Sequence, residues 1–199
     1  MTTAYLTGLG TTAGLIIAIG AQNAYLLSQS VRKNHHIAIA LMCTFFDILF
    51  ISVGVAGVGA FFAQNELLMK IAAYGGAAFL FVYGFFSLRS AFTGKSLGMV
   101  NRGDDSLKKV VLTTLAVTVL NPHVYIDTVI LLGGISSQFD ASNRLMFALG
   151  ACTASALWFY LLTFAGVRLA PFFSKPLTWK ILDISICAVM WSVAVSLII

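Results

Sequence analysis

The sequence predicts an all-α polytopic membrane protein with six transmembrane helices. Three observations lead to this prediction: the composition, the spacing of long apolar stretches, and a one-sided distribution of positive charge. Of the 199 residues, 59% are hydrophobic and 10% are charged, and the mean hydropathy is +0.94. Soluble domains carry about 25% charged residues. This chain therefore has too little charge to cover a water-facing surface.

Six apolar stretches are long enough to cross a bilayer, which requires about 20 predominantly apolar residues per helix. They lie near residues 4–27, 37–62, 67–88, 110–132, 145–167 and 179–199. The first begins at the N-terminus, where no Lys or Arg precedes it and no cleavage site follows it, so we interpret it as a retained helix and not as a signal peptide. Residues 1–199 are predicted to form a single transmembrane domain.

The longest connection between these stretches, residues 93–109, is polar and rich in glycine and charge. It is too short to form a catalytic domain. The chain also lacks an HExxH motif, which carries the chemistry of metalloproteases. We therefore expect a protein that is not an enzyme and needs no cofactor.

Positive charge is concentrated in alternate connections. Ten of the twelve Lys and Arg residues lie in, or within two residues of, the connections between the first and second, third and fourth, or fifth and sixth stretches, and only Lys70 and Arg144 lie on the other side. Cytoplasmic loops of membrane proteins carry such an excess. Both termini are therefore predicted to be outside, in the periplasm, with loop 93–109 in the cytoplasm. The net charge of +5 is explained by topology and does not require a nucleic-acid partner.

The central loop divides the chain into two groups of three stretches. An odd number per half means that related halves would have inverted topology, which is common in transporters. An offset of 98 pairs Asn23 with Asn121, and an offset of 108 sets Asp47 opposite Ser155. These matches are few, and chance matching explains them equally well when they are taken alone. We predict two inverted three-helix repeats, residues 4–92 and 110–199.

Polar residues interrupt the first stretch of each half. Gln22 and Asn23 lie inside the first, and Asn121 and Pro122 lie inside the fourth, where proline removes a backbone donor. Corresponding interruptions in two halves indicate a substrate site near the bilayer midplane. The alternative is a simple proline kink, with asparagine forming interhelical hydrogen bonds.

Three acids lie inside apolar stretches: Asp47, Asp127 and Asp183. No Lys or Arg lies deep enough to pair with the first two, and His123 shares a helix face with Asp127 four residues later. An unpaired carboxylate in a low-dielectric site either holds a proton or binds a mobile cation. The residues therefore favour a carrier of cations. The alternative is a neutral acid with only a structural role, and for Asp183 the two interpretations are equally favoured.

Four segments carry a family resemblance: GAQNA at 20–24, FFD at 45–47, GGAAFLFVYG at 75–84 and LNPHVYIDTVILLGG at 120–134. Together they resemble the LysE family of bacterial lysine and arginine exporters, and the resemblance covers essentially the whole chain. The related neutral amino-acid exporters of the RhtB branch usually lack an acid at the position of Asp127. The resemblance implies export of L-lysine or L-arginine across the bacterial inner membrane, driven by the proton motive force, with Asp47 and Asp127 matching the family's intramembrane aspartates.

On this interpretation, Asp47 and Asp127 alternate between the side-chain cation of the substrate and a proton. The interrupted region, Gln22 and Asn23 with Asn121 to His123, receives the α-carboxylate and α-ammonium groups. Two alternatives stay open: an exporter of divalent metal cations and, less favoured, a membrane anchor subunit for a soluble partner. The sequence is also compatible with a homodimer.

Overall fold

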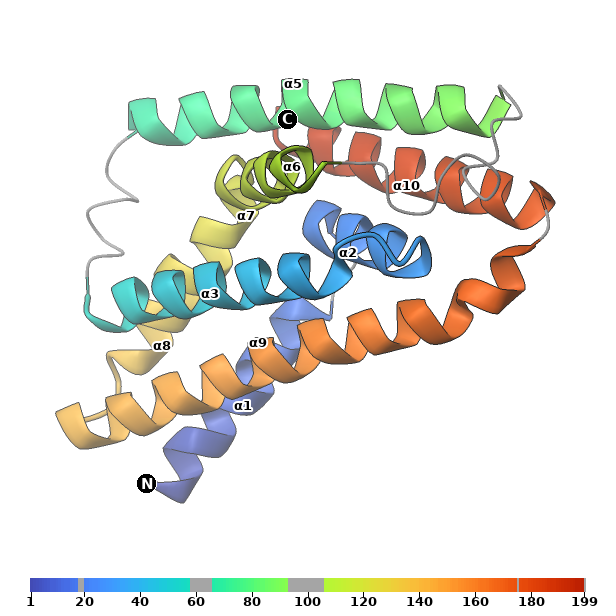
Figure 1. Ribbon diagram of the computed structural model, residues 1–199. Coiled ribbons are helices and arrows are strands. Elements are labelled where there is room, and N and C mark those ends of the chain that lie inside the picture. The colour runs from blue at the N-terminus through green and yellow to red at the C-terminus, as the bar shows by residue number, and fades with distance from the viewer. Residues whose placement is uncertain (18–19, 58–65, 93–105, 175, 199) are drawn as a thin grey trace.

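The computed structural model describes residues 1–17, 20–57, 66–92, 106–174 and 176–198, and its regular elements are helices (Figure 1). Four helices are long and apolar enough to cross a membrane. They are α3 (His36–Val55), α5 (Glu66–Phe92), α9 (Ala141–Leu169) and α10 (Pro176–Ser196). The prediction of a helical, multi-pass membrane protein is therefore confirmed.

Two further helix pairs are sharply bent at short breaks. Helix α1 (Thr2–Ile16) and α2 (Ala21–Val31) meet at 78°, and α6 (Leu107–Val119) meets the helical run Pro122–Ser136 at 57°. That run comprises α7 (Pro122–Val124), the π-helical segment η1 (Tyr125–Leu131) and α8 (Leu132–Ser136). If each bent pair is one span, the number of spans rises to six. The inverted-repeat arrangement and the periplasmic termini stay predictions.

The breaks lie where the sequence predicts interruptions, but some helix boundaries differ from the predicted ones. Helix α6 begins at Leu107, inside the predicted loop 93–109, because Ser106 caps it by accepting a hydrogen bond from the Lys109 N–H at 3.4 Å. Helix α3 ends at Val55, and the predicted end of the second span at 58–62 lies outside the described residues. Helix α9 begins at Ala141, four residues before the predicted span, where the Asp140 carboxylate caps the helix by accepting from the Asn143 N–H at 2.8 Å.

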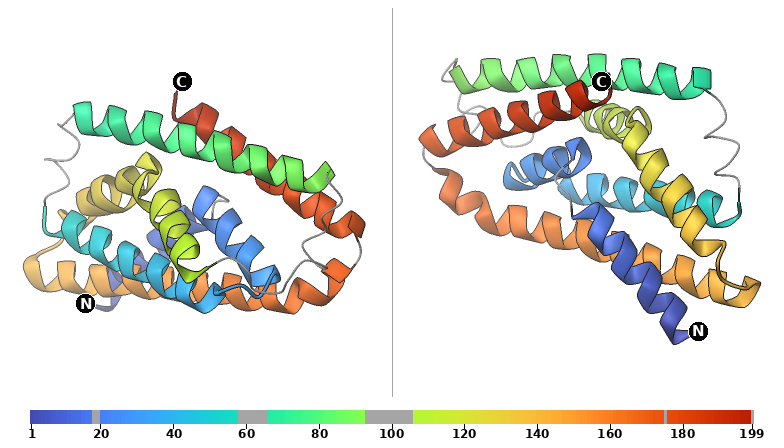
Figure 2. Two further views of the ribbon diagram at one scale, coloured as in Figure 1. Left: turned by 45° about the horizontal axis from the view of Figure 1, so that its top comes forward. Right: turned by 180° about the vertical axis from the view of Figure 1, so that it is seen from behind.

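Glycine allows close helix packing at two contacts. A Cβ on Gly8 in α1 would collide with the backbone carbonyl of Phe147 in α9, and a Cβ on Gly150 would collide with the carbonyl of Tyr5. Small residues let helix backbones approach in this way in membranes. The N-terminal helix is therefore held directly against α9, and the right-hand view of Figure 2 shows the two helices crossing.

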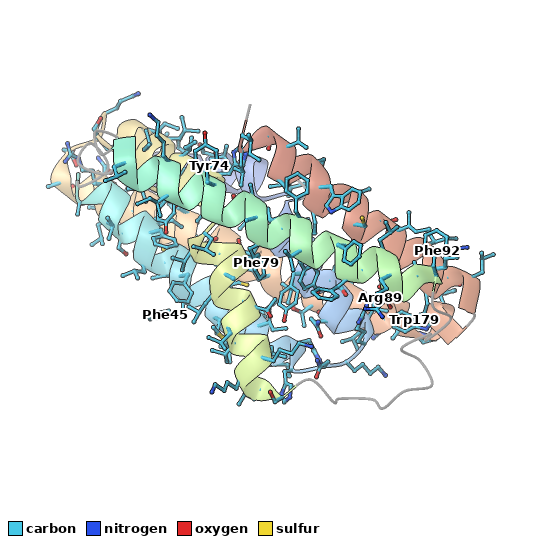
Figure 3. The ribbon with its side chains drawn as sticks, turned by 90° about the horizontal axis from the view of Figure 1, so that it is seen from above. Phe45, Tyr74, Phe79, Arg89, Phe92 and Trp179 are labelled. Carbon is cyan, nitrogen blue, oxygen red and sulfur yellow. The ribbon has the colours of Figure 1, made fainter. Side chains whose placement is uncertain are left out.

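Side chains are distributed as expected for a protein in lipid. Large apolar side chains are exposed on the long helices, including Phe45, Phe85, Leu157 and Phe164, and Figure 3 shows Phe45 pointing away from the ribbon. Helix α2 shows the opposite pattern, because it lies among the other helices (Figure 1) with every residue except Leu27 buried. A short, polar, enclosed half-helix is therefore central to the fold.

Candidate functional site

The two helix breaks meet at one cavity of about 280 Å³, near the lower end of the range for small-molecule sites, about 300–1,000 Å³. Its lining comes from α1, α2, α3, the run Pro122–Ser136 and α10. It brings together six of the eight residues that the sequence predicts for the site: Gln22, Asn23, Asp47, Asn121, His123 and Asp127. Residues up to 181 positions apart in the sequence, Thr12 and Val193, thus line one cavity.

The N-terminus of α2 faces this cavity. Gly20 precedes the helix in an extended conformation and provides no side-chain cap, so the first N–H groups of α2 have no intrahelical partner. Gln22 is 9% exposed, and its Nε2 has no hydrogen-bond partner among the described residues. A helix N-terminus with free donors favours an anion. This side of the cavity therefore suits a carboxylate.

The second break is organised around Pro122. Asn121 is extended, and its Oδ1 accepts a hydrogen bond from the His123 N–H at 3.2 Å. That N–H would otherwise bond the carbonyl of Val119, which instead accepts from the Tyr125 hydroxyl at 2.6 Å. Side chains thus replace the backbone bond lost at the break, as the absence of water in a bilayer demands.

Asp127 lies in the π-helical segment that follows this break. Segments of this kind interrupt α-helices and are frequent at functional sites. Asp127 is half-buried and interacts electrostatically with His123, and both residues line the cavity. The carboxylate is therefore presented to the cavity by irregular backbone.

Asp47 reaches the cavity from the middle of α3 and is 3% exposed. Its Oδ2 accepts a hydrogen bond from the Ser155 hydroxyl of α9 at 2.7 Å. In the part of the chain that the structure describes, neither Asp47 nor Asp127 forms an ion pair with Lys or Arg. A buried carboxylate without a fixed cation is costly when it is charged, so this site favours either a proton or a bound cation.

Two predicted site residues do not line the cavity. Pro122 shapes the break and borders a second hollow with Lys70, His123 and Ser196. Asp183 forms an ion pair with Arg32 at 2.7 Å and accepts a hydrogen bond from Ser90 at 2.9 Å. The structure therefore separates Asp183 from the two unpaired acids.

The structure adds polar residues that the sequence reasoning did not assign to the site. Thr12 and Thr128 line the cavity, and Trp158 donates its indole N–H to the Asn23 Oδ1 at 3.3 Å. A single threonine or tryptophan in an apolar stretch does not indicate a site residue. For Ser155 the sequence gives one indication, because the offset of 108 aligns it with Asp47.

The described residues contain no group of three or more His, Cys, Asp or Glu that could hold a metal ion. The polar groups of the cavity are instead amides, hydroxyls, one imidazole and two separate carboxylates. This combination offers partners for both ends of a small zwitterion as well as for a cation.

A multi-pass helical protein with two broken helices that meet at a cavity lined in part by polar side chains has the architecture of a membrane transporter. Comparison with known proteins agrees with that class. The LysE type translocator model matches residues 13–199, and the chain belongs to this family. No solved structure gives a significant match.

Curated relatives extend over almost the full chain. The arginine exporter protein ArgO of Klebsiella pneumoniae subsp. pneumoniae is 39% identical over 199 residues, covering 99% of this chain and 94% of that protein. The proteins of the same name from Pectobacterium atrosepticum and Escherichia coli K12 are each 37% identical, covering 97% of this chain and 95% and 92% of those proteins. The resemblance predicted from the four sequence segments is confirmed.

Proposed function

We propose that this protein exports L-arginine from the cytoplasm across the bacterial inner membrane in exchange for protons. L-lysine is the second substrate that the same carboxylates would accept. The observation that carries the proposal is the cavity at the two helix breaks, where Asp47 and Asp127 have no ion-pair partner among the described residues. The relatives named as arginine exporters support arginine as the main substrate.

The cavity offers a partner for each charged group of arginine. The guanidinium group binds Asp47 and Asp127, since carboxylates suit its planar donors. The α-carboxylate binds the N-terminus of α2 and the free amide of Gln22. Asn121 and His123 border the position left for the α-ammonium group.

Proton exchange follows from the cost of moving charge. Exporting one positive charge against an inside-negative potential costs about 2.3 kcal/mol per 100 mV. Admission of one proton per exported cation removes this cost. A carboxylate that holds either the substrate or a proton, but not both, couples the two movements.

The test uses a strain that lacks its own arginine exporter and is sensitive to canavanine, a toxic arginine analogue. Expression of the wild-type protein restores growth, whereas Asp47→Asn and Asp127→Asn do not, because amides bind neither a guanidinium ion strongly nor a proton. Asp140→Asn is the matched control. Asp140 is an exposed helix cap whose pKa is lowered by the Asn143 N–H, and asparagine caps equally well.

The proposal fails if both cavity variants, shown by immunoblot to be inserted in the membrane, protect the cells as well as the wild-type protein does. Rescue of a metal-sensitive strain in place of the canavanine-sensitive one would identify a metal exporter instead.

A further inference from the structure

A partly buried ion pair lies outside the cavity and has no role in the proposed mechanism. Arg32, directly after α2, donates from Nη2 to the Oδ1 of Asp183 on α10 at 2.7 Å. Ser90 on α5 donates to the other carboxylate oxygen at 2.9 Å, and the Arg32 guanidinium lies 5.7 Å from the ring centre of Trp179. The Asp183 side chain is 4% exposed. Segments from three parts of the chain therefore meet at one enclosed acid.

These groups form a binding site for a guanidinium ion. Asp183 supplies a negative charge, Ser90 orients the carboxylate, and the Trp179 ring supplies a flat face for a cation. The present occupant belongs to Arg32, whose Nε is buried without a hydrogen-bond partner in the described part of the chain. This occupant carries the same functional group as L-arginine.

The two partners of the pair also complement opposite ends of one amino acid. Asp183 matches a side-chain cation, and Arg32 matches an α-carboxylate, which a guanidinium binds with two parallel hydrogen bonds. An arginine molecule inserted between them would leave neither residue as an uncompensated buried charge, which is the main cost of breaking such a pair.

We propose that the Arg32–Asp183 pair is an entry site for L-arginine, whose guanidinium replaces Arg32 on Asp183 while its α-carboxylate binds Arg32. The inference rests on the proposed export of arginine and adds a second binding site to it. The excess of Lys and Arg in the connections next to this site predicts that it lies at the cytoplasmic end of the protein. Figure 3 places Trp179 close to the end of α5 marked by Arg89 and Phe92.

Helix α2 joins this entry site to the cavity. Its 11 residues span about 16 Å, with Gln22 at the cavity and Arg32 at the entry site. Ser28 and Ser30 between them have buried hydroxyls without partners among the described residues. Such groups are costly when they are left unpaired, and water would satisfy them if α2 moved away from its neighbours. Substrate insertion breaks the bond that ties the end of α2 to α10, and thereby opens this polar route.

The first test measures whether arginine exposes α2. Ser30→Cys is introduced after Cys43, Cys152 and Cys187 are changed to Ala, and a membrane-impermeant maleimide is applied to inverted and right-side-out membrane vesicles. We expect arginine to accelerate labelling in inverted vesicles about tenfold, within the usual range of coupling between sites. Citrulline, which lacks the cation, and agmatine, which lacks the carboxylate, have no such effect. If arginine does not change the labelling rate in vesicles that still perform arginine counterflow, the entry site is wrong. If the wild-type protein performs no arginine counterflow, the proposed function is wrong.

A second measurement keeps the natural cysteines. Arg32→Gln and Asp183→Asn break the same bond, so a purely structural pair predicts the same change in KM for both variants and no change in selectivity. The entry site predicts a difference between them. Asp183→Asn raises the KM for arginine about tenfold. In Arg32→Gln, unlabelled agmatine inhibits the transport of labelled arginine as effectively as unlabelled arginine does. Lys33→Gln, which removes the neighbouring cation, is the matched control and keeps the wild-type preference for arginine. Equal effects of the two variants overturn the proposal.

Discussion

At the residue scale, Trp158 positions Asn23 at the edge of the cavity. Its indole N–H donates to the Asn23 Oδ1 at 3.3 Å, while the Asn23 Nδ2 donates to the Ile16 carbonyl at 2.8 Å. The amide is therefore fixed from both sides, by α9 and by the last residue of α1. Asn23 in turn connects the two halves of the broken helix, so its orientation affects the shape of the cavity.

Trp158→Phe removes the donor and keeps most of the aromatic volume. We expect the KM for arginine to rise about fivefold, since a hydrogen bond of this kind contributes about 1 kcal/mol, with little change in the amount of protein in the membrane. Transport kinetics in proteoliposomes measure the effect. Trp191→Phe is the matched control, because its indole donates to the carbonyl of Phe81 at 3.2 Å, away from the cavity. An equal KM change in both variants would contradict the positioning role.

At the element scale, the breaks could be predicted from the sequence, but their surroundings could not. Pro122 cannot donate to a helix, and Gln22 and Asn23 are polar residues in an apolar run, so each break has a local cause. The π-helical segment around Asp127 and the burial of α2 depend on neighbours distant in the sequence. For the same reason the sequence does not predict the ion pair of Asp183, because its partner Arg32 lies 151 residues away.

The contact between α1 and α9 gives a stability prediction. Gly8→Ala places a Cβ against the Phe147 carbonyl, whereas Gly10→Ala, two residues along the same helix, meets no atom within 4 Å. We expect Gly8→Ala to lower stability by about 1–3 kcal/mol, as overpacking does. The melting temperature in detergent should fall for Gly8→Ala and stay the same or rise for Gly10→Ala. Equal melting temperatures for the two variants would show that α1 and α9 do not pack closely.

At the scale of the whole molecule, most of the positive charges lie in the connections, whereas Asp47 and Asp127 lie inside the helix bundle. The ends of α2, α5 and α9 and the beginnings of α3 and α10 lie toward one end of the molecule (Figures 1 and 2). These helices flank the connections that carry most of the Lys and Arg residues. The positive-inside rule predicts that this end is cytoplasmic. Within the bundle, by contrast, we propose that the carboxylates of Asp47 and Asp127 bind the transported cation and the proton.

The composition was sufficient to predict a helical membrane protein, and the order of apolar stretches was sufficient to predict its long helices. Hydropathy does not report which helices are neighbours, so the pairing of Asp47 with Ser155 required the structure. Orientation in the bilayer and a homodimer depend on interactions with lipid or with a second chain, and the inverted repeats rest on few sequence matches. They stay predictions from the sequence.

The central claim is that the cavity exchanges arginine for protons through Asp47 and Asp127. The most direct measurement is counterflow and net transport of labelled arginine in proteoliposomes, with the pH gradient and the membrane potential set separately. We predict that a pH gradient alone drives arginine movement opposite to the protons, and that Asp47→Asn and Asp127→Asn abolish it. Arginine transport in the wild-type protein that ignores the pH gradient, or that persists in both variants, would contradict the account.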